Sequence, residues 1–394
     1  MRDPPSIGEH VPPNRTLLGP GPSEVHPRVY RAMSAGMVGY MDGSYLDVMD
    51  DVQAGLRYLF GTTNEYTFAV SGTGSAAMEA AMTNLVEPGE TVLTPSNGYF
   101  GERMGAIAER AGATVETVDA PWGEPLSTAA VERAFDRHQP AVVGFVHGET
   151  STGVRQPDVA ELTRIAHEHD AYVVADTVAS LGGVEFRTDD WGVDVVYSGA
   201  QKCLSAPPGV SPITFSDRAV EKVLARDQPP RSWYLDLEGI WEYWDANPSY
   251  HHTGPISNTY ALREALRIVG EEGLEERWAR HQRVAGAIRA GVEELGAPVA
   301  APEEYWLPSL NAVTVPEGID GSAVVDRLMA EYGIEIVGGL GALEGEIFRV
   351  GCMGYSARPA NALSFVTAFG TVLEDEGADV DVAAGAGAAA AQLE

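Results

Sequence analysis

From residue 67 to residue 215 the sequence alternates between short β-branched runs and longer segments with helical spacing. The strand-like runs lie at 67–70, 91–94, 114–118, 141–146, 172–175, 193–197 and 213–215. Helical patterns separate the first five of these runs, at 75–86, 100–111, 128–138 and 159–168. Strands separated by helices of this length form βαβ units, in which helices cover both faces of parallel strands. The pattern predicts an α/β fold with a mostly parallel sheet, and such sheets bind ligands at the carboxyl ends of their strands.

The rest of the chain predicts a second, smaller domain. Helical patterns at 259–270 and 274–295 precede a strand at 311–315, a helix at 322–332, short strands at 335–337 and 347–350, and a helix at 359–374. We expect an N-terminal arm at 1–16, a large domain at 17–270, a small α+β domain at 271–376 and a disordered low-complexity tail at 377–394. The aromatic segment 233–253 predicts a packed loop.

The charge of the chain excludes some partners. With 26 basic and 57 acidic residues the formal net charge is −31, which argues against binding nucleic acid or an anionic membrane. Such an acidic excess is typical of a protein that works in high salt, where charge repulsion is screened. The alternative is an unusually acidic protein of an ordinary environment. Two cysteines, no apolar run long enough to span a bilayer and no signal peptide predict a soluble cytoplasmic protein.

Lysine is nearly absent, which draws attention to one of the two that remain. The chain has 24 arginines but only Lys202 and Lys222 as lysines, and Lys222 lies in a charged helical pattern. Lys202 follows the strand-like run 193–197 and precedes a Pro-Pro-Gly turn. An amine can lose its proton and attack a carbonyl, whereas a guanidinium stays charged. Lys202 is therefore the candidate nucleophile, with an ordinary surface lysine as the alternative.

The segment 71–77, Ser-Gly-Thr-Gly-Ser-Ala-Ala, follows the first strand and opens a helix. Its glycines allow an anion close to the backbone, and the helix N-terminus offers free N–H groups, with the hydroxyls of Thr73 and Ser75 as further donors. The segment also matches a dinucleotide pattern, Gly72-x-Gly74-x-x-Ala77. A nicotinamide site would need an acidic residue after the next strand, and 94–97 contains none. A phosphate is the better interpretation.

Other candidates also follow strands. Asp176 could hold the pyridine nitrogen of pyridoxal phosphate protonated, so that the ring withdraws electrons, or it could only cap a turn. Phe100 offers an aromatic face for stacking, and hydroxyls in 149–153 could bind a ring oxygen. Arg349 lies inside an apolar strand, where it would hold a substrate carboxylate or form an internal salt bridge. The nine histidines form no metal-binding signature.

In combination these segments resemble the class V, fold-type I pyridoxal-phosphate aminotransferases, and most of all the alanine–glyoxylate and serine–pyruvate (serine–glyoxylate) aminotransferases. The resemblance runs from about residue 17 to residue 374 and rests on the segments 19–23, 71–74, 147–153, 176–183, 197–202 and 250–253. It implies that Lys202 carries pyridoxal phosphate as a Schiff base and that Asp176 pairs with the pyridine nitrogen. Val178 and Phe100 would face the two sides of the ring, and Ser151 would bind its 3-oxygen.

The resemblance also implies how the phosphate and the substrate are held. The phosphate is assigned to Thr73, Gly74, Ser75 and Gln201. Tyr250 and Thr253 would reach the phosphate of a neighbouring subunit, which implies a homodimer with shared active sites. Arg349, with the backbone near Gly21, would bind the substrate carboxylate.

The implied activity is transfer of an amino group from a small L-amino acid, alanine or serine, to glyoxylate or pyruvate by a ping-pong mechanism. The main alternative is another activity on the same scaffold, a lyase such as a cysteine desulfurase, which needs a mobile cysteine. Cys352, three residues after Arg349, is poorly placed for that task. A nicotinamide-dependent oxidoreductase is the alternative from another class, and it leaves Lys202 unexplained.

Overall fold

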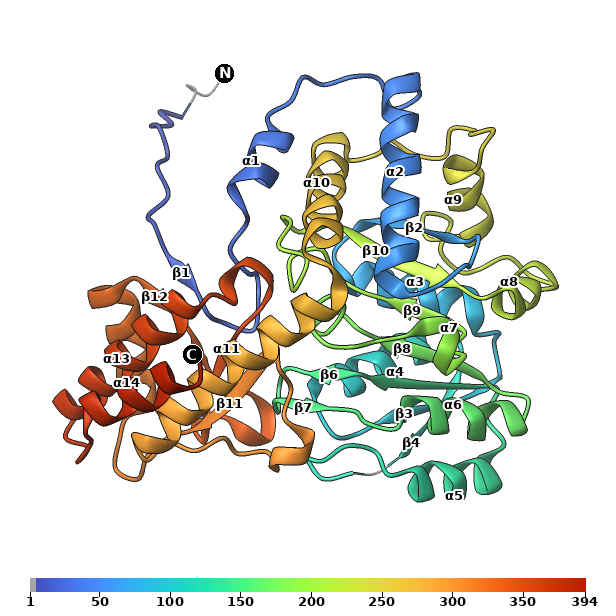
Figure 1. The fold of residues 1–394 in the computed structure, drawn as a ribbon. Coiled ribbons are helices and arrows are strands. Elements are labelled where there is room, and N and C mark those ends of the chain that lie inside the picture. Colours follow the sequence, from blue (N-terminus) through green and yellow to red (C-terminus); the bar gives the residue numbers. More distant parts are fainter. Residues whose placement is uncertain (1–4, 119) are drawn as a thin grey trace.

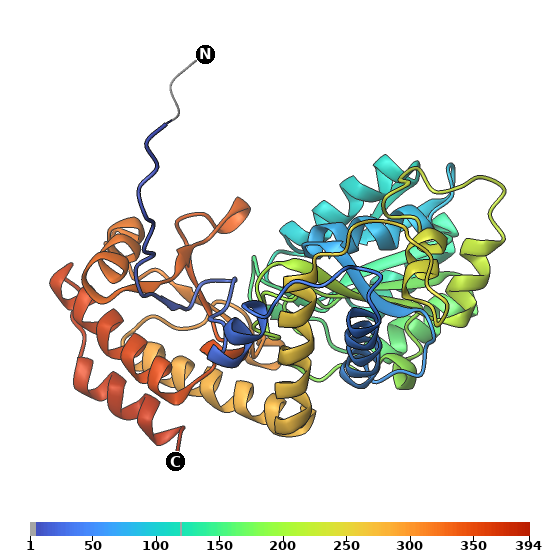
Figure 2. The same ribbon diagram turned by 90° about the horizontal axis from the view of Figure 1, so that it is seen from above.

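The computed structural model describes residues 5–118 and 120–394. Two bodies lie side by side in Figure 2, and the chain crosses between them near its start and again along the helix α11. Each body has its own hydrophobic core: one cluster runs from Val29 to Val269, and the other joins Leu18 to residues between Val284 and Ala389. We propose the division into a large and a small domain on this basis, with the boundary between α10 and α11.

The large body is built on a seven-stranded sheet. Along the described residues the strand order is β2-β10-β9-β8-β5-β3-β4. The strands are β2 (Thr67–Gly72), β3 (Thr91–Pro95), β4 (Thr114–Val118), β5 (Val142–Val146), β8 (Tyr172–Asp176), β9 (Val195–Tyr197) and β10 (Gly209–Phe215). All neighbours pair in parallel except β10, which is antiparallel to both β2 and β9. The predicted mostly parallel sheet is therefore confirmed.

Helices cover the sheet on both sides, as Figures 1 and 2 show. They are α2 (Gly43–Phe60), α3 (Gly74–Leu85), α4 (Tyr99–Ala111), α5 (Thr128–His138), α6 (Val159–Glu168), α7 (Thr188–Trp191), α8 (Asp217–Leu224) and α10 (Ile256–Glu272). Their ends follow local chemistry: the Ser127 side chain caps α5 by accepting from Ala130 N, and Gly61 ends α2 in a left-handed conformation. β-branched strands buried on both faces complete the core.

The small body combines a three-stranded antiparallel sheet with helices. Its sheet has the order β11 (Leu310–Thr314), β14 (Ile347–Gly351), β13 (Val337–Gly338). Its helices are α11 (Leu274–Glu294), α12 (Gly321–Arg327), α13 (Pro359–Asp375) and α14 (Val382–Ala391). This arrangement follows the α+β pattern of the sequence.

Three local expectations were wrong. The tail predicted to be disordered forms the helix α14, because its small residues pack closely against α11 and α13, with Ala389 fully buried. Asp381 caps this helix by accepting from Ala384 N. The start of the predicted large domain belongs to the small body, since β1 (Thr16–Leu17) pairs with β12 (Ile334–Glu335). The aromatic segment 233–253 contains a helix, α9 (Leu237–Trp244), whose apolar face is buried.

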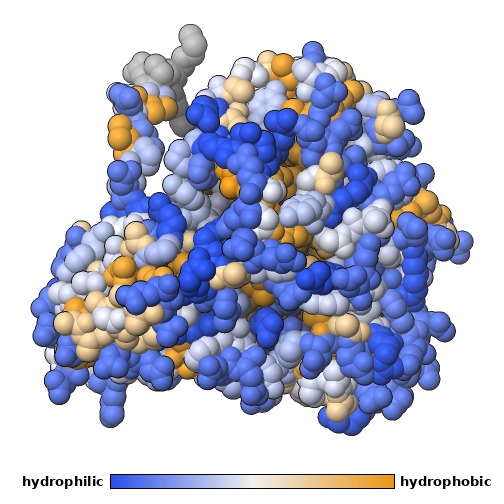
Figure 3. All heavy atoms as spheres, viewed as in Figure 1, coloured by the Kyte–Doolittle hydropathy of each residue, from blue (hydrophilic) through white to orange (hydrophobic). Residues whose placement is uncertain are grey.

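The surface is largely hydrophilic on the face seen in Figure 3, with separate smaller apolar areas. None of the helices in the described ranges is both long and apolar enough to cross a membrane.

Candidate active site

The ends of three neighbouring strands meet at one point. Asp176, the last residue of β8, is in register with Val146 of β5 on one side and Tyr197 of β9 on the other. A cavity of about 210 Å³ opens there. It is lined by Thr73, Gly74, Ser75, Met78, Phe100, Arg103, Val146, Gly148, Thr150, Asp176, Val178, Ala179, Gln201 and Lys202. The position agrees with the rule that α/β sheets bind ligands at the carboxyl ends of their strands.

Asp176 is held rigidly in this cavity. Its Oδ1 accepts from Val178 N at 2.8 Å, and its Oδ2 accepts from the Tyr197 hydroxyl at 2.9 Å. Burial raises the pKa of Asp176 to about 6, and the two hydrogen bonds oppose that rise. A carboxylate fixed in this way, with one edge toward a cavity, can pair with a protonated ring nitrogen.

Lys202 lies across the cavity in the turn that follows β9. Its Nζ donates to the carbonyl oxygen of Pro20, from the segment 19–23 that the sequence singled out. Burial lowers the pKa of the Lys202 amine to about 8, with the charge of Arg349 acting in the same direction. Near neutral pH a useful fraction of this amine is therefore uncharged and able to attack a carbonyl.

Gly21 makes room for Lys202. It adopts φ +108°, and a Cβ atom built there would lie 2.6 Å from Lys202 Nζ. Any larger residue would both strain the backbone and displace the amine. The structure therefore brings Gly21 directly to the predicted nucleophile, as expected of a site for the substrate.

The predicted phosphate turn has the features of an anion site. Thr73 is the N-cap of α3, but within the described residues its side chain forms no capping hydrogen bond, and the N–H groups of Gly74 and Ser75 have no partner there. Gly74 packs closely on Val178, where an added Cβ would lie 3.0 Å from a methyl carbon. The Oε1 atom of Gln201 is buried and has no hydrogen-bond partner among the described residues. Free N–H groups and small residues fit the phosphate of pyridoxal phosphate, to which the NH₂ group of Gln201, rather than its oxygen, can donate.

Phe100 and Ser151 are joined through Glu149, whose importance the sequence did not reveal. The buried Glu149 carboxylate accepts from Phe100 N at 3.0 Å, from Ser151 N at 2.9 Å and from Ser151 Oγ at 2.6 Å. Phe100 lines the cavity, but among 149–153 it is Thr150, not Ser151, that lines it. The role of Ser151 at the ring oxygen stays a prediction.

Arg349 lies in the small body, in the middle of β14. Its Nε donates to the carbonyl oxygen of Gly338 at 2.8 Å, and no ion pair involves it within the described chain. Burial lowers its pKa, and the charge of Glu149 opposes this effect. Its charge acts on the pKa of Lys202, although Arg349 does not line the cavity itself. The remaining guanidinium nitrogens can serve a carboxylate that enters from the domain interface.

Tyr250 and Thr253 lie outside this cavity, on the surface. Tyr250 is 56% exposed, and its hydroxyl is 3.4 Å from Thr253 Oγ1. His252, which lies between these two residues in the sequence, contacts the phosphate turn: its Nε2 atom is 2.6 Å from Ser71 Oγ. The structure therefore does not bring Tyr250 and Thr253 to the site of their own chain.

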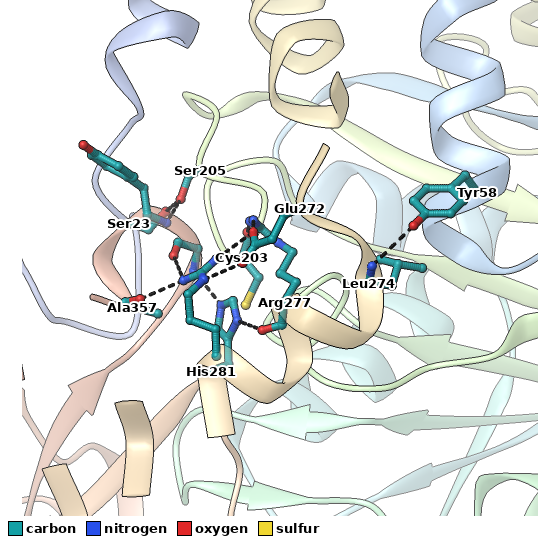
Figure 4. A network of polar contacts seen from close by, with 12 residues as sticks. Ser23, Tyr58, Cys203, Ser205, Glu272, Leu274, Arg277, His281 and Ala357 are labelled. Carbon is teal, nitrogen blue, oxygen red and sulfur yellow. Dashed lines mark hydrogen bonds and ion pairs between the residues drawn. The ribbon is translucent and has the colours of Figure 1, made fainter. Parts of the chain in front are cut away.

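The turn that carries Lys202 is held by the start of α11 and by Tyr355 of the small body. Figure 4 shows the polar network around Cys203, Arg277 and His281. Arg277 donates to the Cys203 carbonyl oxygen through Nη2 and to Glu272 through Nη1. His281 Nε2 accepts from Gly354 N at 2.9 Å, so its Nδ1 donates to the carbonyl oxygen of Arg277. Ser205, with φ +55°, accepts from Tyr355 N at 2.7 Å.

Two residues of the site received no role from the sequence analysis, Tyr197 beside Asp176 and Arg103 in the cavity wall. Tyr197 was placed in a strand and in the segment 197–202, and its position beside Asp176 follows from the pairing of adjacent strands. Arg103 lies three residues after Phe100, on the same face of α4, and this helical spacing is the signal that could have identified it.

The two cysteines do not form a catalytic centre. Both Cys203 and Cys352 are fully buried, and burial raises their pKa values to about 11 and about 12. A buried thiol of high pKa neither moves on a loop nor acts as a nucleophile at neutral pH. A cysteine desulfurase requires a mobile cysteine, so the burial of both thiols argues against that activity.

Pyridoxal phosphate supplies, when bound, an aromatic ring that accepts the electrons left by a departing proton. The carboxylate of Asp176 would hold the ring nitrogen and keep a proton there. Lys202 would hold the cofactor through its amine, and this amine is placed to accept and return a proton at the α-carbon of a substrate. Aromatic and aliphatic residues, Phe100 and Val178, line the cavity and limit the entry of water.

Comparison with known proteins agrees with this geometry. The family model for aminotransferase class-V matches residues 28–350. An alanine–glyoxylate aminotransferase of Drosophila melanogaster is 41% identical over 349 residues, covering 88% of this chain and 89% of that protein. The crystal structure of an alanine–glyoxylate aminotransferase from Nostoc sp. is similar with TM-score 0.91 and 46% identity, covering 93% and 97% of the two chains.

A second solved structure is also similar over the whole chain. The ureidoglycine–glyoxylate aminotransferase of Bacillus subtilis gives TM-score 0.96 and 38% identity, covering 98% of this chain and 99% of that one. Strand-end lysine and aspartate, phosphate turn and family match all point the same way. The chain therefore belongs to the class V aminotransferases, as a pyridoxal-phosphate-dependent, fold-type I enzyme of the alanine–glyoxylate type.

Proposed function

We propose that the protein transfers the amino group of a small L-amino acid, alanine or serine, to glyoxylate or pyruvate by a ping-pong mechanism. The observation that carries this proposal is the narrowness of the site around Lys202. The cavity of about 210 Å³ must hold the cofactor as well, and it is smaller than the typical ligand pocket of about 300–1,000 Å³. Gly21 closes the site beside Lys202, since even a Cβ atom added there would lie 2.6 Å from Nζ.

Arg349 is the proposed anchor for the carboxylate shared by all these substrates. A planar guanidinium binds a carboxylate through two parallel hydrogen bonds, and only Nε of Arg349 is bound within the protein as described. Because donor and acceptor both carry an α-carboxylate, one arginine can position both in turn. Lys202 would then move a proton between the same two positions, in opposite directions in the two halves of the reaction.

We further propose that the enzyme is a cytoplasmic homodimer whose subunits share their active sites. Tyr250 and Thr253 are exposed and lie outside the cavity of their own chain, which supports a role toward a second subunit. A complementation experiment tests this: a Lys202→Ala subunit and a Tyr250→Phe/Thr253→Ala subunit, each impaired alone, should regain activity when mixed. Failure to regain activity in proven mixed dimers would contradict shared sites.

(S)-Ureidoglycine is a second candidate donor. The similarity to the Bacillus subtilis ureidoglycine–glyoxylate aminotransferase extends over 98% of this chain, which is a specific reason to test this donor. A cysteine desulfurase activity on the same scaffold is disfavoured by the burial of Cys352, and a nicotinamide-dependent oxidoreductase by the family match.

The deciding experiment records the visible spectrum of the purified protein before and after addition of single amino donors. L-alanine, L-serine, L-aspartate and (S)-ureidoglycine are added separately, and glyoxylate or pyruvate follows. The expected result is loss of the cofactor's visible band with alanine or serine and its return with the oxo acid. If only (S)-ureidoglycine removes the band, ureidoglycine is the donor in place of alanine or serine. Sulfide released from L-cysteine would favour the desulfurase.

A further inference from the structure

The cavity contains very little positive charge for a ligand that carries a phosphate. Among the described residues that line it, Arg103 and Lys202 are the basic ones. Lys202 is committed to the aldehyde carbon of the cofactor rather than to its phosphate. The whole protein has a net charge of −31, so an anion approaches against an unfavourable field. A single arginine near the phosphate turn therefore has to supply most of the positive charge that attracts the phosphate.

Three contacts place Arg103 where it can supply this charge. It lies on α4, and its Nη1 donates to Ser75 Oγ, in the first turn of α3, at 3.2 Å. Its guanidinium carbon lies 4.8 Å from the centre of the Phe100 ring and 5.0 Å from that of the Tyr99 ring. Stacking on aromatic faces fixes the plane of a guanidinium without neutralising its charge.

Arg103 has no competing carboxylate partner. Within residues 5–118 and 120–394 its one side-chain hydrogen bond goes to Ser75, and it takes part in no ion pair. Most other arginines with side-chain contacts are already paired with acids, as Arg28, Arg164 and Arg327 are. In a chain with 57 acidic residues, an arginine that faces a cavity with no acid bound to it is available for an external anion.

We propose that Arg103 is the ionic anchor of the cofactor phosphate, and that it joins the phosphate turn to the ring-stacking residue Phe100. The phosphate turn alone offers neutral donors: backbone N–H groups, the hydroxyls of Thr73 and Ser75, and the amide of Gln201. Arg103 adds the one full charge on this side of the cavity. Its stacking on Phe100 couples the position of the phosphate to the position of the ring.

The proposed contact between Arg103 and the phosphate predicts that loss of Arg103 weakens the binding of a ligand with the phosphate more than that of the same ligand without it. The variant Arg103→Met keeps a long apolar side chain over Phe100 and removes the charge. We expect the full-length apoprotein of this variant to bind pyridoxal phosphate about 10- to 100-fold more weakly, as for loss of one charge-assisted hydrogen bond. Its affinity for pyridoxal, which lacks the phosphate, should stay close to that of the unmodified protein.

Arg110→Met is the matched control, because Arg110 lies on the same helix but is exposed and away from the cavity. It changes the net charge by the same amount and should leave both affinities unchanged. Both ligands are titrated by their absorbance on binding, with far-UV circular dichroism to verify folding. If the variant binds both ligands more weakly by the same factor, Arg103 acts on the ring and not on the phosphate, and the proposal is wrong. Unchanged affinity for pyridoxal phosphate would overturn the proposal.

Inorganic phosphate provides a second test that needs no change to the site. It should compete with pyridoxal phosphate for the unmodified apoprotein, but not with pyridoxal, when compared with KCl at equal ionic strength. Arg103→Lys, which keeps the charge without the planar group, should retain part of this competition. If phosphate and KCl act alike on the unmodified protein, there is no anion site here and the proposal fails, even if Arg103→Met does not fold.

Discussion

Arg277, in the first turn of α11, donates a hydrogen bond to the carbonyl oxygen of Cys203, the residue directly after Lys202. On the other side, Ser23 Oγ donates to the carbonyl oxygen of Lys202 itself at 2.7 Å. The turn that carries the reactive amine is thus held between the N-terminal segment and α11. Arg277 lies in the first turn of α11, the helix along which the chain crosses between the two bodies, so this turn is joined to that crossing.

We expect Arg277→Gln to impair both stability and turnover. Arg277 is 3% exposed and paired with Glu272, and breaking a buried pair of this kind costs about 3–5 kcal/mol in the free energy of unfolding. The loosened turn should lower kcat more than it raises KM. Urea unfolding and steady-state kinetics check this. Arg283→Gln, an exposed change on the same helix, is the control and should alter neither.

Lys202→Ala should abolish transamination and leave the fold intact. Loss of the amine removes both the nucleophile and the proton carrier, and we expect a loss of at least about 10²- to 10⁴-fold in turnover. Single-turnover measurements with L-alanine and a thermal melt would follow the two effects separately. Residual turnover near that of the unmodified enzyme would disprove the assignment of Lys202.

Asp176→Asn should retain some cofactor but lose most activity, by at least about 10²-fold, because the amide cannot stabilise a proton at the ring nitrogen. The measurement is the rate of spectral change on adding a donor, at equal occupancy of the site by the cofactor. An unchanged rate would mean that Asp176 only caps the turn.

The same residue should make the stability of the apoprotein depend on pH. Burial raises the pKa of Asp176 from 3.8 to about 6. Between these values the folded protein binds a proton that the unfolded chain has lost. The free energy of unfolding should therefore fall as pH rises from about 4 to about 6, by up to about 3 kcal/mol. In Asp176→Asn this contribution should be absent; if both proteins follow the same curve, another group is responsible.

Arg349→Ala should mainly raise the KM for carboxylate substrates. The loss of an anchoring guanidinium predicts an increase of about 10- to 100-fold, with a smaller effect on kcat. Arg349→Lys keeps the charge but not the planar pair of donors, so its KM should be intermediate. Steady-state kinetics with glyoxylate and with L-alanine measure both halves of the reaction. If KM is unchanged in both variants, Arg349 is structural.

The net charge of −31 predicts stabilisation by salt. Screening shortens the range of repulsion between surface carboxylates from about 10 Å at 0.1 M salt to about 3 Å at 1 M. The midpoint of thermal unfolding should therefore rise with KCl, and choline chloride at equal ionic strength should act similarly. A midpoint that is flat or falls with KCl would contradict the interpretation of the acidic surface as an adaptation to salt.

The sequence predicted the fold well because its patterns are local. Strand-like runs bounded by glycine and proline, and helices of ordinary length between them, determine a mostly parallel sheet with little dependence on distant residues. The tail was misjudged for the same reason. Its alanines and glycines have no local hydrophobic pattern, and their packing against α11 and α13 depends on surfaces made elsewhere in the chain.

Some residues of the candidate site could likewise be predicted from local sequence, and others could not. Residues directly after strands, such as Lys202 and Asp176, could be identified because the carboxyl ends of parallel strands meet at one edge. Arg103 and Glu149 were missed because each depends on contacts between elements. The acidic Glu149 is buried against Phe100 and Ser151, and Arg103 is significant only because it reaches Ser75 on another helix.

The sequence by itself determined the sheet and predicted the phosphate turn and the reactive lysine, since each depends on residue type and on order along the chain. Tertiary structure alone decided what surrounds that lysine. Pro20 and Gly21 lie against its amine, and Arg277 holds its turn from the start of α11. Burial among these groups lowers the pKa of Lys202 to about 8, an effect set by distances in space rather than along the sequence.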